Sequence, residues 1–251
     1  MIAVIGGSGL YQLDVLDSVR RIEMETPFGT PSDAIVVGCL ADRDVAFLSR
    51  HGASHRLLPH RVNYRANLWA LHAIGVRRVL GVNAVGGIRS DMGPRTLVIP
   101  HQLIDYTHGR ATSFSDIEGA EVRHIDFGQP YSAPLRSRLL DAARLTAIPV
   151  VDGGVYGATQ GPRLETEAEI ARMRRDGCDL VGMTGMPEAA LARELQIEYA
   201  SISLVANWAA GCGPAGEAPA AEISIDEIFA HLAHATRNVA PLLEAMVRAL
   251  D

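Results

Sequence analysis

The feature that most constrains the fold of this chain is an alternation of two hydrophobic patterns along its 251 residues. Short runs rich in β-branched residues, which are typical of buried strands, alternate with segments whose apolar residues recur every three to four positions, which is typical of helices packed against a sheet. No repeat or low-complexity block interrupts the alternation. It predicts an α/β fold, as one domain over residues 1–251, with a mixed or largely parallel sheet.

The same patterns locate the expected elements. We predict strands at residues 2–5, 34–38, 45–49, 79–83, 96–100, 154–158, 180–183 and 199–205. We predict helices at residues 62–74, 134–145, 166–175, 187–195 and about 224–250. The last helix begins with a Ser-x-x-Glu capping box formed by Ser224 and Glu227. Residues 209–221 are rich in Gly, Ala and Pro without a hydrophobic period, so we expect a loop there.

Charge and composition exclude some classes of function. The formal net charge is −6, so the chain lacks the basic excess that nucleic acid or an anionic membrane surface attracts, and we expect neither as a partner. All 23 basic side chains are Arg, because the sequence contains no Lys. A Schiff-base enzyme needs a lysine amine and a Walker-type phosphate loop needs its lysine, so both mechanisms are excluded.

The cysteines and the apolar runs bear on the compartment. Cys39, Cys178 and Cys212 lie far apart and form no Cys-x-x-Cys pair, which suits a reducing environment better than a disulfide scaffold. No basic segment precedes the first apolar run, and no run approaches the roughly 20 residues that a membrane span needs. We therefore expect a soluble, cytoplasmic protein.

Two segments at the ends of predicted strands offer groups that suit an anion. In Gly6-Gly7-Ser8-Gly9, the glycines allow backbone N–H groups and the Ser8 hydroxyl to converge, although an ordinary tight turn has the same composition. Arg50 and His51 follow another strand. The fork of donors on Arg50 matches phosphate oxygens, and a surface ion pair is the alternative role for that residue.

Polar groups also stand at other strand and helix ends. Residues 82–87 run from a strand into an expected Gly-Gly turn. Such a turn would let a flat ring lie on the backbone, although a plain bend in the chain would explain it as well. Glu165 precedes a helix, which it could simply cap, and Thr184 precedes another helix with free N–H groups. Asn207 closes an apolar strand, where its amide could serve local backbone groups. Together these groups predict a ligand site at the strand ends of one α/β sheet.

Taken in order, the motifs resemble those of a known family. They are Gly-Gly-Ser-Gly-Leu at 6–10, Thr-Pro-Phe-Gly at 26–29, Arg-His-Gly at 50–52, Val-Asn-Tyr-Arg-Ala-Asn at 62–67, Asn-Ala-Val-Gly at 83–86, Gly-Pro-Arg at 161–163 and Met-Thr at 183–184. The order is similar to that of the methylthioadenosine phosphorylase branch of the trimeric purine-nucleoside phosphorylases, over nearly the whole chain. The resemblance implies the nucleoside phosphorylase fold, in which a central mixed sheet, distorted towards a barrel, is flanked by helices. It also implies cleavage of an N-glycosidic bond by inorganic phosphate.

The resemblance further implies a homotrimer that takes phosphate as a co-substrate and needs no metal or organic cofactor. His51, His55 and His60 invite a metal interpretation. They lie across an expected loop with no carboxylate in ligand register, so we expect no metal site.

The family also implies roles for individual residues. The phosphate would be held by Ser8, Arg50, His51, Asn83, Ala84 and Thr184. The nucleoside would be contacted by Met183 against the ribose, and by Val85, Gly86, Leu164, Glu165, Asn207, Ala209, Ile225, Ile228 and His124. Negative charge builds on the purine as the glycosidic bond lengthens, so Glu165 and Asn207, next to the base, are the expected catalytic residues.

The base contacts are where this sequence departs from adenosine-type members of the branch. Those members have an Asp where Asn207 stands, another acid where Ala209 stands, and a Ser where Glu165 stands. A carboxamide can donate to a 6-oxo group and accept from a protonated N7, while a carboxylate can accept from the N1–H of hypoxanthine. The Glu and Asn pair is similar to that of the 6-oxopurine phosphorylases, so we expect a 6-oxopurine base.

The 5' end of the nucleoside is predicted from a second departure. Inosine and guanosine phosphorylases have a His for the 5'-hydroxyl near the start of the last helix, and Ile225 stands there in this chain. Ile223, Ile225 and Ile228 would form an apolar surface that favours a methylthio group over a hydroxyl, unless they are only core positions of the helix. His124 matches a residue that reaches the neighbouring subunit's 5' pocket in the family.

The two departures together predict S-methyl-5'-thioinosine as the substrate. Methylthioadenosine, inosine and guanosine remain alternative substrates. A nucleosidase that uses water and a nucleoside-binding protein without turnover remain alternative classes, and the number of phosphate-directed groups argues against both.

Overall fold

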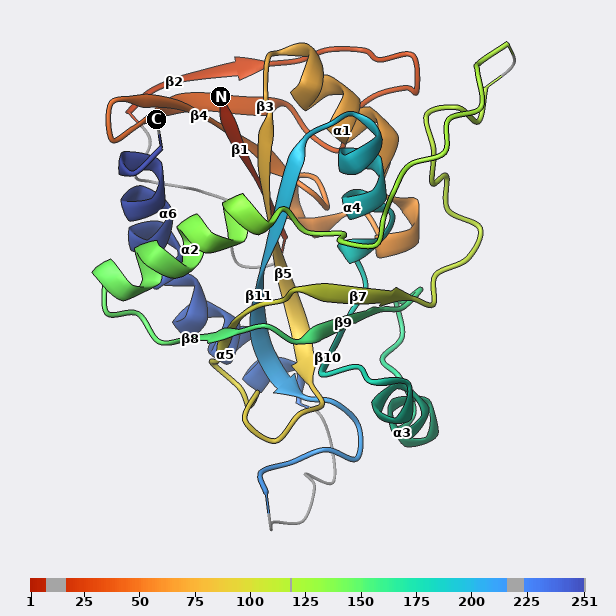
Figure 1. Ribbon diagram of the computed structural model, residues 1–251, viewed down its shortest axis with the longest axis vertical. Helices are drawn as coiled ribbons and strands as arrows, with labels where there is room; N and C mark the ends of the chain where they lie inside the picture. Colours follow the sequence, from red (N-terminus) through yellow and green to blue (C-terminus); the bar gives the residue numbers. More distant parts are fainter. Residues whose placement is uncertain (8–16, 118, 216–223, 251) are drawn as a thin grey trace.

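The computed structural model describes residues 1–7, 17–117, 119–215 and 224–250 (Figure 1). The strands are β1 (Ile2–Gly6), β2 (Asp17–Ile22), β3 (Ile35–Leu40), β4 (Arg43–Ser49), β5 (Arg78–Gly87), β6 (Leu97–Ile99), β7 (Gln102–Asp105), β8 (Val150–Asp152), β9 (Val155–Ala158), β10 (Leu180–Gly182) and β11 (Glu198–Trp208). The α-helices are α1 (Tyr64–Ala73), α2 (Ala133–Leu145), α3 (Glu167–Asp176), α4 (Gly185–Glu194), α5 (Ile225–Thr236) and α6 (Val239–Arg248). None of these helices is long and apolar enough to cross a membrane.

The strands form one mixed sheet centred on β5. On one side, β5 pairs in parallel with β1, β1 pairs in parallel with β4, and β4, β3 and β2 continue as antiparallel neighbours. On the other side, β5 pairs in parallel with β11 along its whole length. The second half of β5 also pairs with β10, which runs antiparallel to it. The expected mixed sheet is confirmed. Its central strand, β5, pairs with three others, β1, β10 and β11.

The pairings beyond β5 close on themselves. β11 pairs with β6, and β6 pairs with β8. The chain continues from β6 into β7 and from β8 into β9, and β7 and β9 pair in turn. β9 then pairs with β10, which returns to β5. This closed path is the distortion towards a barrel that the family resemblance implies.

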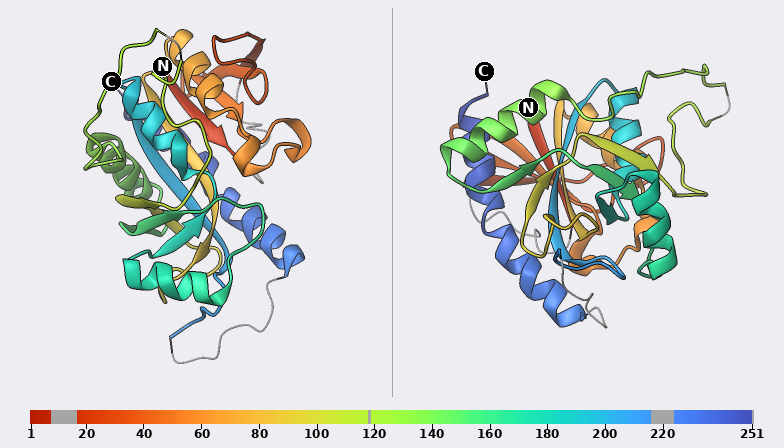
Figure 2. Two further views of the ribbon diagram at one scale, coloured as in Figure 1. Left: turned by 90° about the vertical axis from the view of Figure 1, so that its right-hand side faces the viewer. Right: turned by 60° about the horizontal axis from the view of Figure 1, so that its bottom comes forward.

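Helices cover both faces of the sheet, as the predicted pattern requires. Figure 1 and the right panel of Figure 2 show α2, α5 and α6 along one side of β5 and β11, with α1, α3 and α4 along the other. Alternate residues of β1 serve these two layers: Ala3 and Ile5 belong to the core cluster shared with α1 and α4, whereas Ile2 and Val4 belong to the cluster shared with α2 and α6. A strand buried on both faces has the continuous apolar run seen in the sequence.

The eight predicted strands and the first four predicted helices are present, with shifted ends. The strands β2, β7 and β8 were not predicted, because each is either polar or only three to four residues long. The prediction of one final helix at 224–250 is wrong. The chain turns between α5 and α6 at Arg237 and Asn238, and Ala235 and Val239 on either side are both fully buried. Ser224 does cap α5, since its side chain accepts from the N–H of Glu227.

The predicted glycine turn at residues 82–87 is also wrong, because the whole segment stays in β5. Gly87 pairs with both Leu180 and Trp208, and a Cβ at Gly87 would lie 1.8 Å from the carbonyl oxygen of Met92. Gly87 is therefore required because another part of the backbone approaches it closely, and not because the chain turns there.

Candidate active site

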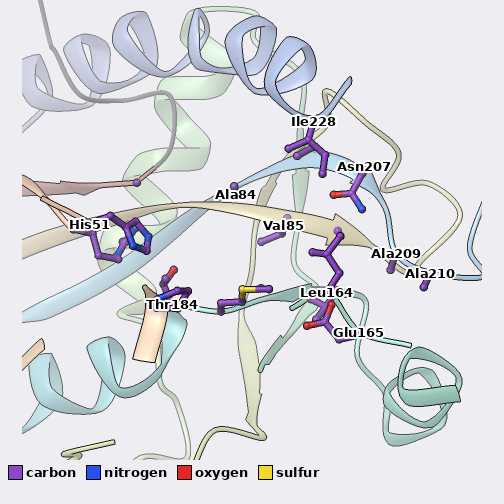
Figure 3. Close-up of a pocket in the computed structure, with 18 of the residues that line it drawn as sticks. His51, Ala84, Val85, Leu164, Glu165, Thr184, Asn207, Ala209, Ala210 and Ile228 are labelled. Atoms are coloured by element: carbon purple, nitrogen blue, oxygen red, sulfur yellow. The ribbon is translucent and has the colours of Figure 1, made fainter. Parts of the chain in front are cut away.

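A pocket lies where several strands end, as predicted from the polar groups at those positions. Its wall is built from the second half of β5 and from residues that directly follow β1, β4 and β10 or close β11. Figure 3 shows His51 and Thr184 at one end and Glu165, Asn207 and Ile228 at the other, with Ala84 and Val85 of β5 between them. The site residues predicted from distant parts of the sequence thus meet in one cavity.

Arg50 lies at the end of the pocket lined by His51 and Thr184, where we expect phosphate and which we call the phosphate end. It is fully buried, and its guanidinium group binds protein groups. Its Nε and Nη2 atoms donate to the two carboxylate oxygens of Glu188, each at 2.8 Å. Nη1 donates to the carbonyl of Val82 and Nη2 to that of Ile5. The expected fork of donors for phosphate is therefore wrong, since four of the five N–H groups are engaged and one on Nη1 remains. The Nη1 atom lies 3.2 Å from the position that a Cβ on Gly7 would take, and Gly7 lines the pocket.

Glu188 and its neighbours form a buried network behind this end of the pocket. Neither Arg50 nor Glu188 has exposed side-chain surface. The hydroxyl of Tyr199 donates to Glu188 at 2.8 Å, and the ring of Tyr131 stacks on that of Tyr199. Two opposite charges with these added hydrogen bonds compensate each other's loss of water.

His51 lines the pocket as a neutral imidazole. Burial, and then the charge of Arg50, lower its pKa to about 4. Its Nδ1 lies 2.8 Å from the carbonyl oxygen of Leu57, which can only accept, so Nδ1 carries the hydrogen. The Cδ2 edge, next to Nε2, lies 3.7 Å from the Cβ position of Gly7. His51 therefore presents an acceptor at this end of the pocket.

Thr184 is held from two directions. Its hydroxyl donates to Oδ1 of Asn83 at 2.9 Å, and Nδ2 of Asn83 donates to the hydroxyl of Ser201. Its N–H and that of Gly185 both lie 3.3 Å from the hydroxyl oxygen of Tyr156. Two of the N–H groups expected to be free at this helix start are therefore engaged. The side chain of Asn83 lies behind the pocket wall, and its neighbour Ala84 lines the pocket.

At the other end of the pocket, where we expect the base and which we call the base end, Glu165 stands just before α3. Thr166 caps this helix in a full capping box with Glu169, so Glu165 itself is not the cap. The carboxylate of Glu165 accepts from the Thr159 hydroxyl through Oε1, at 2.6 Å. Among the described residues Oε2 has no hydrogen-bond partner, which leaves one carboxylate oxygen for a ligand.

Asn207 lies beside a register shift near the end of β11 and lines the same end of the pocket. Its Nδ2 donates to the carbonyl oxygen of Trp208 at 2.6 Å. A carboxylate could not make this bond, so it fixes which side of the amide is the donor. The second amide hydrogen and Oδ1 bond to nothing else in the described part of the chain, and they are available to a ligand.

Apolar groups fill the rest of the wall. Val85 lies along its middle, and Leu164 and Ala209 lie beside the base end. Met183 and Gly86 also line the pocket. Ile228 of α5 lines the pocket near Asn207, as Figure 3 shows. The nearby His231 is engaged elsewhere, because its Nδ1 lies 2.8 Å from the carbonyl oxygen of Ala206.

The remaining predicted residues are either outside the described part of the chain or away from the pocket wall. Ser8 and Ile223 lie outside the described residues, and Ile225 is described only as the first residue of α5. His124 is exposed, on a segment that extends away from the sheet in Figures 1 and 2. In the described residues no group of three His, Cys, Asp or Glu side chains is arranged to hold a metal ion.

Arg110 is a residue that sequence analysis missed. Its Nη1 donates to the carbonyls of Met183 and Met186, and its Nη2 donates to those of Thr159 and Gln160. These are the segments that carry Thr184 and Glu165 into the pocket. Arg110 comes from a loop with no periodic pattern, so the sequence gives no signal for it. Glu188 lies four residues after Thr184 of the Met-Thr motif, and its acidic side chain in an apolar helix is the signal that could have predicted a buried ion pair.

Comparison with known proteins defines the class. A family described as the phosphorylase superfamily matches residues 1–248. The chain belongs to this superfamily. It is 61% identical over 222 residues to a probable S-methyl-5'-thioinosine phosphorylase of Xanthomonas campestris, covering 88% of this chain and 89% of that protein. It is 45% identical over 215 residues to a 6-oxopurine nucleoside phosphorylase of Pyrococcus furiosus, covering 84% and 80%.

Solved structures agree with this assignment. The fold superimposes on methylthioadenosine phosphorylase from Schistosoma mansoni in complex with adenine with a TM-score of 0.90, at 31% identity, over 100% of this chain and 92% of that one. The expected nucleoside phosphorylase fold is confirmed.

Proposed function

We propose that the protein cleaves S-methyl-5'-thioinosine with inorganic phosphate, giving hypoxanthine and 5-methylthioribose 1-phosphate. Membership of the phosphorylase superfamily supports the reaction type. The names of the Xanthomonas and Pyrococcus relatives support a 6-oxopurine base, and the former supports the 5'-methylthio group. Both names agree with the substrate expected from Glu165, Asn207 and Ile228.

The observation that carries the choice of base is the set of free donors and acceptors at the base end. Glu165 keeps one acceptor oxygen, and Asn207 keeps one donor hydrogen and one acceptor oxygen. A 6-oxopurine offers a donor at N1, an acceptor at O6 and, as it leaves protonated, a donor at N7. Each group then has a partner. Adenine offers an acceptor at N1 to the carboxylate, which would leave two acceptors opposed at roughly 1–3 kcal/mol.

The chemistry follows from charge development. As the bond from C1' to N9 lengthens, the sugar becomes cationic and the purine gains negative charge. Phosphate held at the end lined by Arg50, His51 and Thr184 attacks C1' from the face opposite the leaving base. Asn207 stabilises the leaving purine through its N7 and O6, and Met183 packs against the ribose. Fixed dipoles that need no rearrangement are the efficient way to stabilise such charge.

Assembly and cofactors complete the proposal. We infer a homotrimer that needs phosphate as a co-substrate and no metal or organic cofactor. The exposed segment of His124 supports the trimer, because it extends from its own subunit and carries the residue expected at a neighbour's 5' pocket.

A single preparation can test the proposal. Methylthioinosine, methylthioadenosine and inosine are each incubated with and without phosphate, and base release is followed. We expect base release only with phosphate, and the highest kcat/KM for methylthioinosine. Release at the same rate without phosphate would show a nucleosidase, and binding without release would show a binding protein. Inosine as the best substrate would reject the apolar 5' pocket lined by Ile228.

A further inference from the structure

The base-binding carboxylate is fixed by a residue that none of the sequence motifs singled out. The Thr159 hydroxyl oxygen lies 2.6 Å from Oε1 of Glu165 and 3.3 Å from the carbonyl oxygen of Gly182. A hydroxyl has a single hydrogen, and both neighbours are acceptors when Glu165 is ionised. The shorter contact takes that hydrogen, so Thr159 donates to Glu165.

Thr159 is itself held firmly by the backbone around it. Its N–H donates to the carbonyl of Gly182 at 2.8 Å, and its own carbonyl accepts from Arg110 at 3.1 Å. Gly182 ends β10, and the next two residues are Met183 and Thr184. Thr159 therefore ties the carboxylate at the base end to the strand whose continuation lines the middle and the phosphate end of the pocket.

Without the hydrogen bond from Thr159, the Glu165 side chain could turn into a second cavity. Its side chain is half-buried and lines this second cavity as well as the pocket. That cavity is also lined by Thr159, Arg163 and Arg172. Arg163 already binds both oxygens of Glu169, at 2.8 and 2.7 Å, so it does not hold Glu165 in the pocket. A carboxylate free to turn into that cavity would lose its alignment with a base.

We propose that Thr159 is a positioning residue for base selection, whose hydroxyl fixes Oε1 of Glu165 so that Oε2 faces the N1–H of a 6-oxopurine. This inference rests on the proposed function. Thr159 touches neither the base nor the phosphate, and it acts only through Glu165. Its effect falls on KM for the nucleoside and on the choice of base, and not on KM for phosphate.

The first test removes the hydroxyl and keeps the shape, with Thr159→Val. We expect KM for methylthioinosine to rise about tenfold, which corresponds to one hydrogen bond to a charged group, while KM for phosphate stays within about twofold. The kcat/KM preference for methylthioinosine over methylthioadenosine should fall by a similar factor. Thr159→Ser restores the hydroxyl and should restore both values. Thr146→Val is a matched control, because that hydroxyl donates to Ala142 on α2, away from the pocket.

The second test asks whether the effect passes through Glu165. Thr159→Val is combined with Glu165→Ala, which removes the acceptor of the Thr159 hydroxyl, and we expect the double variant to be no more than about twofold worse than Glu165→Ala alone. Thr159→Ala, a second hydroxyl-free variant, provides the same comparison if Thr159→Val folds poorly. A loss of equal size in both backgrounds, or a wild-type base preference in folded Thr159→Val, would overturn the inference. If the wild-type enzyme itself prefers methylthioadenosine, the proposed function is rejected. The coupling of Thr159 to Glu165 would then still be measured with that nucleoside.

Discussion

The two ends of the pocket differ in how their polar groups are satisfied. At the phosphate end, Arg50 pairs with Glu188 and Thr184 pairs with Asn83, and all four are buried. At the base end, Glu165 and Asn207 are half-buried, and the structure leaves hydrogen-bonding groups unpaired on each. The difference separates two tasks. Groups locked in the sheet can preorganise a reaction that all substrates share, whereas groups at strand ends and loops can change base preference without disturbing the fold.

The largest effect should follow from breaking the buried ion pair. Glu188→Gln leaves the Arg50 charge uncompensated, and we expect the free energy of unfolding to fall by about 3–5 kcal/mol. Glu198→Gln is the matched control, because its partner Arg78 and Glu198 itself are both part-exposed, and we expect a loss of less than about 1 kcal/mol there. Urea denaturation measures both. Equal losses of unfolding free energy in the two variants would contradict the claim that the phosphate end depends on its buried network.

A somewhat smaller effect is expected from acid. The native pKa of His51 is lowered to about 4 by burial and by Arg50, while the unfolded chain takes up this proton at about pH 6.5. Between these values only the unfolded state is protonated, so stability falls as the pH drops. We expect His51 to account for about 2–3 kcal/mol of the loss between pH 7 and pH 4.5. Unfolding free energies of wild type and His51→Gln at both pH values give this number, and identical losses would rule it out.

The base end should respond in selectivity, with a smaller loss of stability than the buried ion pair. We expect the triple variant Asn207→Asp, Glu165→Ser, Ala209→Asp to shift the kcat/KM ratio towards methylthioadenosine by about 10- to 100-fold, the value of one or two repaired hydrogen-bond mismatches. Its unfolding free energy should fall by about 1–3 kcal/mol, because Asn207→Asp opposes a carboxylate to the Trp208 carbonyl that Nδ2 now bonds, and Ala209→Asp places a carboxylate at a buried position. Unchanged base selectivity would show that other residues read the base.

The smallest effect is expected at the apolar wall. Ile228→Val removes one methylene, and we expect KM for methylthioinosine to rise about fourfold, from roughly 0.8 kcal/mol of lost burial. KM for inosine, which lacks the methylthio group, should change less. Steady-state kinetics with the two nucleosides measure the difference. An equal change for both would place Ile228 in the helix core and not against the 5' substituent.

The sequence predicts regular elements and residue types better than it predicts side-chain partners. Strands such as β1, β5 and β11 carry long apolar patterns, so they could be located, whereas β7 and β8 are too short to show a period. The residues at strand ends could be assigned to a site because strand ends meet in space. That Arg50 is directed at Glu188, 138 residues away, could not be predicted, since no local pattern specifies such a contact. The same holds for Arg110 and for Thr159, whose roles depend on neighbours from other segments.

The free groups of Glu165 and Asn207 are expected to select a 6-oxopurine. The most direct measurement is internal competition, in which methylthioinosine and methylthioadenosine are mixed at equal concentration with phosphate and wild-type enzyme. The ratio of the two rates is then the ratio of the two kcat/KM values. We predict that hypoxanthine is released faster by at least about 10²-fold, within the range that base hydrogen bonds can supply. Equal release of the two bases, or faster release of adenine, would contradict the claim.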